Sequence, residues 1–326
     1  MRVAVTGASG FVGKWVVADL VGRGANVIAC VRDAQAAHRI TAATPMVTGD
    51  MRNTRAWDRA FEACHAVVHL AGRAHCSDKS PHKALAEHRA VNRDGTRMVA
   101  QIAARAGVRR FVFLSSIGVN GSSTTKGMSF RLEAKPCPCS PYAQSKFEAE
   151  LALQEVAGGT GMEVVSVRPP MVYGPGAPGN LKVLTAALAR RVPLPLGTIH
   201  NRRAFIAATN LADFISTCVV APEAAGRALL VSDGIDISTS DFIRCLSTIC
   251  GGRAPIVPFP PALLRILLES TAMGGIASRL LDDLMIDLSG TIDVTGWRPP
   301  QSMYDAMRGM FDETSASARA PQGKMA

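Results

Sequence analysis

The first thirteen residues, MRVAVTGASGFVG, constrain the fold more than any other part of the chain. A short apolar run over residues 2–6 is followed at once by three glycines, and then by apolar residues at helical spacing. This order predicts a strand, a tight turn and a helix. Such a turn lets the backbone approach a pyrophosphate and points the N–H groups of the helix N-terminus at it. We therefore expect a dinucleotide to contact Gly7, Ser9, Gly10, Phe11, Val12 and Gly13.

Apolar strand-like runs alternate with helical patterns through the first half of the chain. Alternation of this kind predicts an α/β fold whose parallel sheet is doubly wound, of the Rossmann type. We expect the dinucleotide-binding domain over residues 1–168, with some later segments returning to it. A smaller α/β substrate-binding region is expected over residues 169–313, and the small, polar residues 314–326 are expected to be disordered.

Charge and composition exclude several classes of function. The formal charge of +10 is spread out, and aromatic residues are only 5% of the chain. We therefore expect affinity for small phosphate-bearing ligands, or mild affinity for a membrane surface, and none for nucleic acid. We find no apolar run of membrane-spanning length and no signal peptide, so the expected place is the cytoplasm, with no integral membrane span.

The cysteines and histidines do not predict a metal site. Among the eight cysteines, Cys137 and Cys139 are the only close pair. His75, Cys76 and His82 fit no recognised ligand spacing. No metal is expected, and most cysteines are interpreted as reduced core residues.

The end of the second predicted strand bears on the choice of cofactor. An acidic residue there would bond the ribose hydroxyls of NAD, but Val31 holds that place and Arg32 follows it. A guanidinium suits a 2′-phosphate, so NADP(H) is favoured over NAD(H). Asp33 keeps NAD open, since a shift of one residue would restore an acidic partner.

Other strand ends and helix positions are expected to line the same cofactor. Small residues end the fourth strand, and an asparagine lies in the helix after it. The additional cofactor-binding positions are Asp50, Met51, Leu70, Ala71, Gly72, Asn92 and Pro169, with Tyr142 and Lys146.

Ser116, Tyr142 and Lys146 form the expected catalytic set. Ser116 ends a predicted strand, while Tyr142 and Lys146 are one turn apart on a helix and share a face. A tyrosine hydroxyl has a pKa of about 10, and a nearby ammonium lowers it. Tyr142 can then exchange a proton with a substrate oxygen that Ser116 positions, while a nicotinamide exchanges the hydride.

These motifs together resemble the extended short-chain dehydrogenase/reductase family, over roughly residues 1–300. Within it, the chain is similar to bacterial nucleotide-sugar 4-epimerases and 4-keto reductases of polysaccharide pathways. The resemblance depends on Gly7, Gly10 and Gly13, on 69–71 (His-Leu-Ala), on Asn92, Ser116, Tyr142 and Lys146, and on Arg168 with 173–175 (Tyr-Gly-Pro).

The resemblance implies a UDP-linked substrate and further contacts. Asn180 and Leu181 look like the pair that opens a helix beside UDP, and Arg203 and Arg279 look like the diphosphate-binding arginines. It also implies a homodimer, formed by helices near residues 84–106 and 142–157.

Departures from the family pattern reduce the number of reactions that we expect. The Asp-Glu pair of nucleotide-sugar dehydratases is replaced by Ile117 and Gly118, so dehydration is not expected. The favoured function is reduction of a UDP-4-keto-6-deoxy-N-acetylhexosamine at C4. The alternatives are a UDP-hexose or UDP-N-acetylhexosamine 4-epimerase with tightly bound NAD, an NADPH-dependent ketone reductase of the dihydroflavonol-reductase type, and a non-catalytic dinucleotide sensor.

Overall fold

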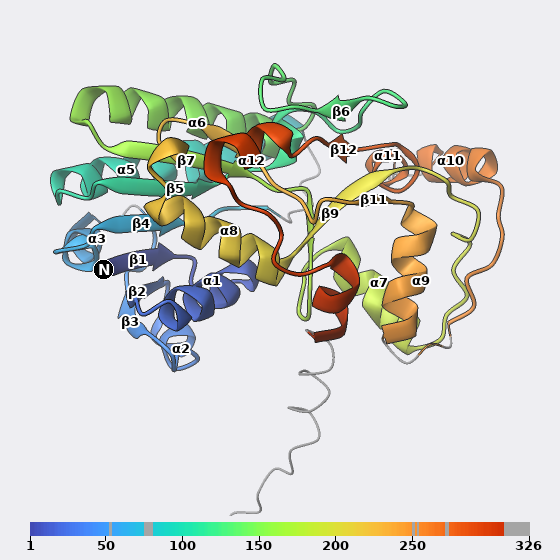
Figure 1. The fold of residues 1–326 in the computed structure, drawn as a ribbon, viewed down its shortest axis with the longest axis horizontal. Coiled ribbons are helices and arrows are strands. Elements are labelled where there is room, and N and C mark those ends of the chain that lie inside the picture. Colours follow the sequence, from blue (N-terminus) through green and yellow to red (C-terminus); the bar gives the residue numbers. More distant parts are fainter. Residues whose placement is uncertain (52–53, 75–80, 250–251, 253, 271–273, 310–326) are drawn as a thin grey trace, which may run out of the picture.

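The computed structural model describes residues 1–51, 54–74, 81–249, 252, 254–270 and 274–309. Within this part, seven strands form one parallel sheet, which confirms the doubly wound α/β prediction. In spatial order the strands are β10 (Ala228–Leu230), β7 (Glu163–Arg168), β5 (Arg110–Leu114), β4 (Ala66–His69), β1 (Arg2–Thr6), β2 (Asn26–Val31) and β3 (Thr44–Val47) (Figure 1).

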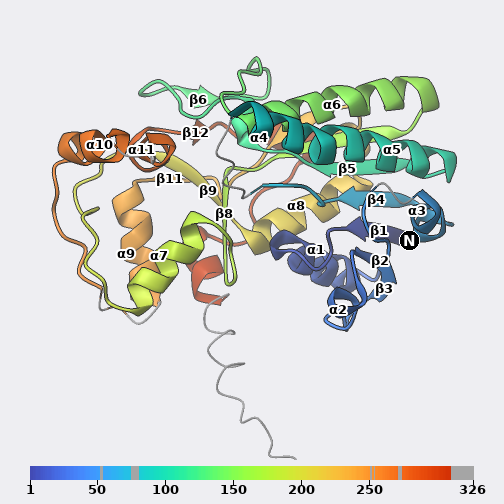
Figure 2. The ribbon, with the colours of Figure 1, turned by 180° about the vertical axis from the view of Figure 1, so that it is seen from behind.

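Helices cover both faces of this sheet because its strands are apolar on both sides. In β1, Val3 and Val5 face one buried cluster, whereas Ala4 between them faces another. The first cluster is closed by α1 (Phe11–Gly22) and α8 (Ala208–Val220). The second is closed by α3 (Thr54–Phe61), α5 (Thr96–Arg105) and α6 (Pro141–Thr160) (Figure 2). The short helix α2 (Ala34–Ala37) connects β2 to β3.

A second group of elements lies at the carboxyl ends of the strands (Figure 1). Its three-stranded sheet consists of β8 (Met171–Tyr173), β9 (Arg203–Ala207) and β11 (Asp236–Ile237). Around it lie α7 (Asn180–Ala189), α9 (Thr239–Ile249), α10 (Pro261–Glu269) and α11 (Gly274–Leu281). The chain runs back and forth between the groups, since β10 returns to the main sheet beside β7. The boundary at residue 168 remains a prediction.

The elements that complete the chain are short. They are η2 (Ile117–Val119), η3 (Pro222–Ala224), α12 (Ser289–Thr295), and the two-residue strands β6 (Ser129–Phe130) and β12 (Met285–Ile286), which pair with each other. Residues 303–309 are also helical. Residues 314–326, expected to be disordered, lie outside the described part of the chain.

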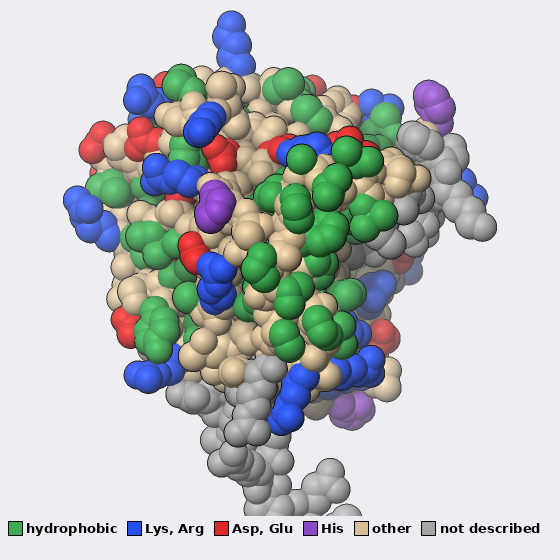
Figure 3. Space-filling view, turned by 90° about the vertical axis from the view of Figure 1, so that its right-hand side faces the viewer, with side chains coloured by type: hydrophobic (Ala, Val, Ile, Leu, Met, Phe, Trp, Pro, Cys, Tyr) green, Lys and Arg blue, Asp and Glu red, His purple; other side chains and the backbone are tan. Residues whose placement is uncertain are grey.

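One long helix expected from the sequence is divided. The helical stretch near 84–106 is α4 (Pro81–His88), a π-helical segment η1 (Arg89–Gly95) and α5. The apolar stretch near 260–285 contains α10 and α11. In α10, Leu264 is buried, but Leu263, Ile266 and Leu267 are 54%, 64% and 57% exposed. Hydrophobic side chains gather on this side of the molecule (Figure 3). None of the described helices is both long and apolar enough to cross a membrane.

A buried ion pair fixes α6 against the main sheet. Arg168, at the end of β7, donates from Nε and Nη2 to the two carboxylate oxygens of Glu150 on α6, at 2.9 and 2.5 Å. Both side chains are almost completely buried, at 6% and 4% exposure. The Ser115 hydroxyl donates to Glu150, and Arg168 also donates to the Asn120 amide oxygen. The carboxylate and the guanidinium are therefore both paired and hydrogen-bonded, as buried charges require.

We expect Glu150→Gln to lower the free energy of unfolding by about 3–5 kcal/mol, because it leaves the Arg168 guanidinium buried without a carboxylate. Glu148→Gln is the matched control on the same helix, since Glu148 pairs with the more exposed Arg89 and its loss is expected to change stability much less. Urea denaturation followed by circular dichroism measures both. Equal losses in the two variants would contradict the structural role of the buried pair.

Candidate active site

The glycine turn brings the start of α1 close to the end of β1. Gly7 has a φ of +68°, and the Gly10 N–H donates to its carbonyl at 2.9 Å. A Cβ on Gly13 would lie 2.2 Å from the Gly7 oxygen, so only glycine lets α1 approach β1 here. Helix α1 has no side-chain cap and no acidic residue in its first turn. Its first N–H groups are thus available to an anion, and the turn fits a dinucleotide.

The other residues expected in this turn lie where the prediction puts them. Ser9 is exposed in the turn itself, and Phe11 and Val12 form the first turn of α1. The side chains of Phe11 and Val12 are half-buried and pack toward the apolar clusters. A ligand at the turn would therefore contact these two residues mainly through their backbone N–H groups.

A buried histidine holds the neighbouring strand end in place. His69, the last residue of β4, bonds Thr6 of β1 through Nδ1 at 2.8 Å and Thr96 of α5 through Nε2 at 3.0 Å. Burial, with a smaller contribution from Lys146, lowers the His69 pKa to about 3, so the ring is neutral. The Thr6 hydroxyl also accepts from the Ala71 N–H at 3.2 Å. His69 therefore has a structural position.

Tyr142 and Ser116 come together although they lie on different elements. Ser140 caps α6 by accepting from the Ala143 N–H at 3.2 Å, and Pro141 begins the helix, which places Tyr142 in its first turn. Burial raises the pKa of Tyr142 to about 12, while a hydrogen bond with Ser116 acts in the opposite direction. Tyr142 is therefore protonated at neutral pH, in the state that can donate a proton.

Lys146 lies one turn further along α6, at the end of β5. Its ammonium donates to the Leu114 carbonyl at 2.9 Å and lies 4.5 Å from the centre of the Phe113 ring. Burial lowers the Lys146 pKa to about 8, and the Glu150 carboxylate acts against that shift. Other titratable groups near it are neutral His69 and Tyr142. At neutral pH the lysine is therefore mostly charged and can stabilise negative charge on a neighbouring oxygen.

Asn92 lies in the π-helical segment η1 and closes the same end of the sheet. Its side chain accepts from the Arg73 N–H at 2.8 Å and donates to the Arg73 carbonyl at 3.0 Å and to Ser145 at 2.9 Å. A Cβ on Gly72 would approach the Asn92 oxygen to 3.1 Å and the Lys146 nitrogen to 3.2 Å. The strand end 70–72 therefore lies between the glycine turn, Asn92 and Lys146.

The end of β2 distinguishes the roles of its two charged residues. The Asp33 carboxylate caps α2 by accepting from the Ala36 N–H at 2.8 Å. The Arg32 side chain is exposed and makes no hydrogen bond or ion pair with any residue that the structure describes. Arg32 is thus available to a ligand at this strand end, whereas Asp33 is already engaged.

The remaining positions expected to bind the cofactor lie beside η1 and beside the turn after Ser116. Met51 packs against Gly95 of η1, where a Cβ would come within 2.9 Å of the Met51 methyl group. Asp50 precedes it and is exposed. The Pro169 carbonyl accepts from the Ile117 N–H at 2.9 Å, which places Pro169 beside the turn after Ser116.

The residues expected to bind substrate lie on the second group of elements. Asn180 is exposed at the start of α7, after Gly179 with a φ of +66°. Leu181 is buried in the apolar cluster of that group, so its side chain is not available and only its backbone can contact a ligand.

Arg203 is a buried cation rather than a surface charge. It is 6% exposed, and it donates to the carbonyls of Asp282 at 2.7 Å and Ser278 at 3.4 Å. Burial lowers its pKa to about 10; the Asp282 carboxylate acts against that shift, nearby Arg279 on α11 adds to it, and the Asp283 carboxylate acts against it. Among the described residues, no carboxylate lies within ion-pair distance of Arg203. Arg203 and Arg279 thus bring two guanidinium groups close together, with the carboxylates of Asp282 and Asp283 nearby.

Lys14 was not predicted from the sequence, although it follows the last glycine of the turn directly. Its ammonium donates to the Pro175 carbonyl at 3.0 Å, so it connects α1 to the loop that leads into α7. Glu150 was also missed, although its spacing of four residues from Lys146 on a helix is a usable signal. Lys14 connects α1 to the loop before α7, and Glu150 connects α6 to the end of β7.

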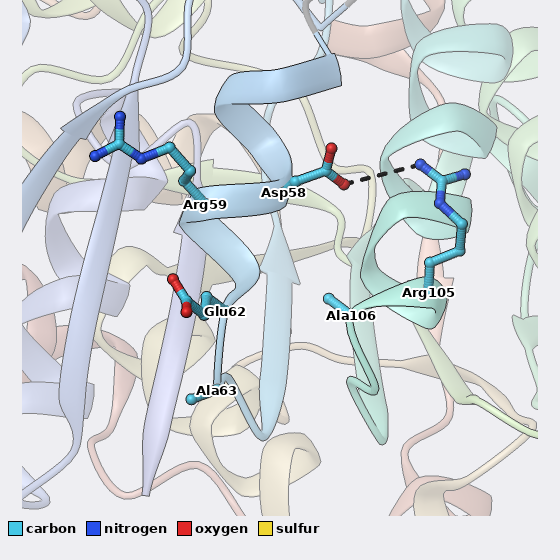
Figure 4. Close-up of a pocket in the computed structure, with 6 residues that line it drawn as sticks. All are labelled: Asp58, Arg59, Glu62, Ala63, Arg105 and Ala106. Atoms are coloured by element: carbon cyan, nitrogen blue, oxygen red, sulfur yellow. Dashed lines mark ion pairs between the residues drawn. The ribbon is translucent and has the colours of Figure 1, made fainter.

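A shallow hollow of about 410 Å³ lies elsewhere, between the ends of α3 and α5 (Figure 4). These helix ends lead into the beginnings of β4 and β5. The hollow is therefore at the amino-terminal end of the strands, whereas the glycine turn is at their carboxyl end. None of its lining residues is a predicted site residue; they are Asp58, Arg59, Glu62, Ala63, Arg105 and Ala106. The described residues contain no cluster of three or more metal-ligating side chains, and His75 and Cys76 lie outside them.

Comparison with known proteins agrees with this geometry. Residues 3–231 match the NAD dependent epimerase/dehydratase family. A UDP-glucose 4-epimerase from Vibrio cholerae is 34% identical over 310 residues, covering 94% of this chain and 93% of that protein. Cinnamoyl-CoA reductase 1 from Oryza sativa is 30% identical over 264 residues, covering 75% of this chain and 74% of that protein.

The fold is also found in solved structures. The UDP-glucuronic acid 4-epimerase from Bacillus cereus in complex with NAD superimposes with a TM-score of 0.77 at 18% identity, covering 99% of both chains. The family match and the identity to the Vibrio cholerae relative confirm the predicted resemblance to extended short-chain dehydrogenases/reductases. This chain is an enzyme of the NAD-dependent epimerase/dehydratase family.

Proposed function

We propose that this enzyme uses NADPH to reduce the C4 ketone of a UDP-4-keto-6-deoxy-N-acetylhexosamine, in bacterial polysaccharide biosynthesis and in the cytoplasm. The observation that carries the proposal is the end of β2, where Arg32 is uncommitted and Asp33 is engaged in capping α2. An exposed guanidinium there favours a 2′-phosphate, and NADPH is a cofactor of net reductions.

Each phosphate group of the cofactor and of the substrate is bound by a cationic side chain or by a helix N-terminus. The glycine turn and the N-terminus of α1 hold the cofactor pyrophosphate, and Arg32 holds its 2′-phosphate. Arg203 and Arg279, together with Asn180 at the start of α7, hold the diphosphate of the substrate. Arg203 gains an anionic partner in direct contact, which the nearby carboxylates of Asp282 and Asp283 do not provide.

The chemical part concerns three side chains. When bound, the nicotinamide supplies the hydride. Ser116 donates a hydrogen bond that positions the carbonyl oxygen of the sugar, and Tyr142 gives its proton to that oxygen as negative charge develops there. Burial keeps Tyr142 protonated before the reaction, and the Lys146 ammonium stabilises the phenolate that remains afterwards.

The 4-epimerase remains a second candidate because of the Vibrio cholerae relative, which aligns over nearly the full chain. In that reaction Tyr142 first accepts and then returns a proton, and no cofactor is consumed. A ketone reductase with a non-sugar substrate is a third candidate, which the 30% identical rice reductase favours. The cations at Arg203 and Arg279 favour a diphosphate-bearing substrate over this third candidate.

Stoichiometry tests the proposed function. Purified enzyme is first denatured to release and identify any retained dinucleotide. It is then given NADPH with the UDP-4-keto sugar, and separately UDP-hexoses alone. We expect NADPH oxidation in step with loss of the keto sugar, and no change in the UDP-hexoses. Retained NAD, with interconversion of UDP-hexoses and no net cofactor consumption, would replace the reductase by the epimerase.

Tyr142→Phe is expected to lower turnover by about a hundred- to ten-thousand-fold, because it removes the proton donor while keeping the ring. Binding of NADPH, measured by fluorescence titration, should remain nearly unchanged. Tyr304→Phe is the matched control, since Tyr304 is 48% exposed and lies outside the site. Retention of turnover in the Tyr142 variant would favour a non-catalytic sensor.

Arg32→Ala is expected to weaken NADPH binding by about 10- to 100-fold, because a charge-assisted hydrogen bond contributes about 1.5–3 kcal/mol. Its affinity for NADH should not fall. Arg105→Ala removes the same charge from an exposed position in the distant hollow and serves as the control. If NADPH and NADH binding respond alike, the 2′-phosphate role of Arg32 is wrong.

We also propose a homodimer formed by α5 and α6. These helices lie side by side on one face of the sheet (Figure 2), and Leu151 of α6 is 43% exposed there. Light scattering is expected to give twice the chain mass of 34.4 kDa. A mass of one chain at micromolar concentration would exclude the dimer.

A further inference from the structure

Two exposed cysteines lie immediately before the helix that carries Tyr142. Cys137 and Cys139 flank Pro138, and Ser140, which caps α6, follows directly. The Cys137 N–H donates to the Val119 carbonyl at 2.8 Å, so this segment runs beside η2, which begins one residue after Ser116. The two thiols therefore lie in the segment that joins the neighbourhood of Ser116 to the start of the helix carrying Tyr142. A chemical change at these thiols can affect both.

These thiols differ from the other cysteines that the structure describes. Cys30, Cys64 and Cys218 are buried and Cys245 is half-buried. Burial raises the thiol pKa in each of these four, which lowers the fraction of reactive thiolate. Cys137 and Cys139 are both exposed. Thiol chemistry within the described part of the chain is thus concentrated at this pair.

The spacing of the two cysteines allows them to be joined. Residues two apart have Cα atoms separated by at most about 7 Å, which overlaps the range of about 4.4–6.8 Å found in disulfides. The Cys139 Sγ lies 3.2 Å from the Cys137 carbonyl oxygen, so it is turned back toward the backbone of Cys137. Pro136, Pro138 and Pro141 restrict the backbone around the pair and reduce the conformational freedom lost on closure.

We propose that Cys137 and Cys139 form a reversible dithiol–disulfide modification site that controls the start of α6. The oxidant is a low-molecular-weight disulfide of the glutathione type. The thiolate of one cysteine attacks a sulfur of that disulfide and releases one thiol. The second cysteine then attacks the mixed disulfide, which forms the intramolecular S–S bond and releases the second thiol. The protein loses two hydrogens and the small disulfide is reduced to two thiols, so atoms and electrons balance.

Formation of the disulfide would change the first turn of α6. A disulfide brings the two Cβ atoms to about 3.8 Å and so changes the backbone directly before Ser140. The bond from the Ala143 N–H to the Ser140 hydroxyl, 3.2 Å in the reduced chain, is the cap most exposed to this change. Weakening the cap loosens the turn that holds Tyr142 beside Ser116. This inference does not depend on which reaction the enzyme performs.

Mass spectrometry and hydrogen exchange test it on the full-length protein. The protein is equilibrated with mixtures of reduced and oxidised glutathione, remaining thiols are alkylated, and the peptide containing residues 137–139 is analysed. We expect it to lose two hydrogens and to regain them with dithiothreitol. Amide exchange over residues 142–144 should become about fivefold faster, as loss of an N-cap implies. Cys137→Ser and Cys139→Ser should each prevent both changes, whereas Cys245→Ser should prevent neither.

Two results would overturn the proposal. One is a glutathione adduct on each cysteine without an intramolecular bond, which would show that the backbone keeps the thiols apart. The other is a disulfide that forms without any change in exchange over residues 142–144, which would show that the pair is not coupled to the helix. Neither result bears on the cofactor or the substrate, so the proposed reaction is tested separately.

Discussion

The buried ion pair between Glu150 and Arg168 determines where α6 lies, and most of the site follows from that placement. Two charges removed from water persist only if each is paired and hydrogen-bonded, so the geometry of this contact has little tolerance. It fixes the helix one turn beyond Lys146 and two turns beyond Tyr142. The end of β7 is fixed by the same contact, and with it the exit of the chain toward β8.

The site also depends on keeping neighbouring groups neutral around one buried cation. His69 lies near Lys146 but is kept neutral by burial, and its two ring nitrogens are occupied by threonine hydroxyls. Tyr142 is kept protonated by the same low polarity. Only the lysine carries a charge in this group at neutral pH, and it does so with help from Glu150. Because its neighbours His69 and Tyr142 are neutral, Lys146 is the charged group of this set at neutral pH.

The sequence was sufficient for the sheet, because glycine spacing and alternating apolar runs are local signals. It did not reveal the π-helical segment η1, since α- and π-helices use the same residues and differ only in which N–H meets which carbonyl. It gave no sign of β6 pairing with β12, because each has two residues and they are far apart in the chain. Tyr142 could be predicted because it follows a serine cap and a proline at a helix start. The contacts of Lys14 with Pro175 and of Glu150 with Arg168 were not predicted, because each joins residues that are distant in the chain.

The return of β10 to the main sheet has a consequence for how the protein is made. Until residues 228–230 leave the ribosome, the outer edge of β7 has no partner, although the preceding strands are already complete. An open edge of a parallel sheet can pair with another chain and lead to aggregation. The second group of elements must therefore be synthesised, at least in part, before the nucleotide-binding sheet is closed. Folding of the two halves is thus linked in time by the path of the chain.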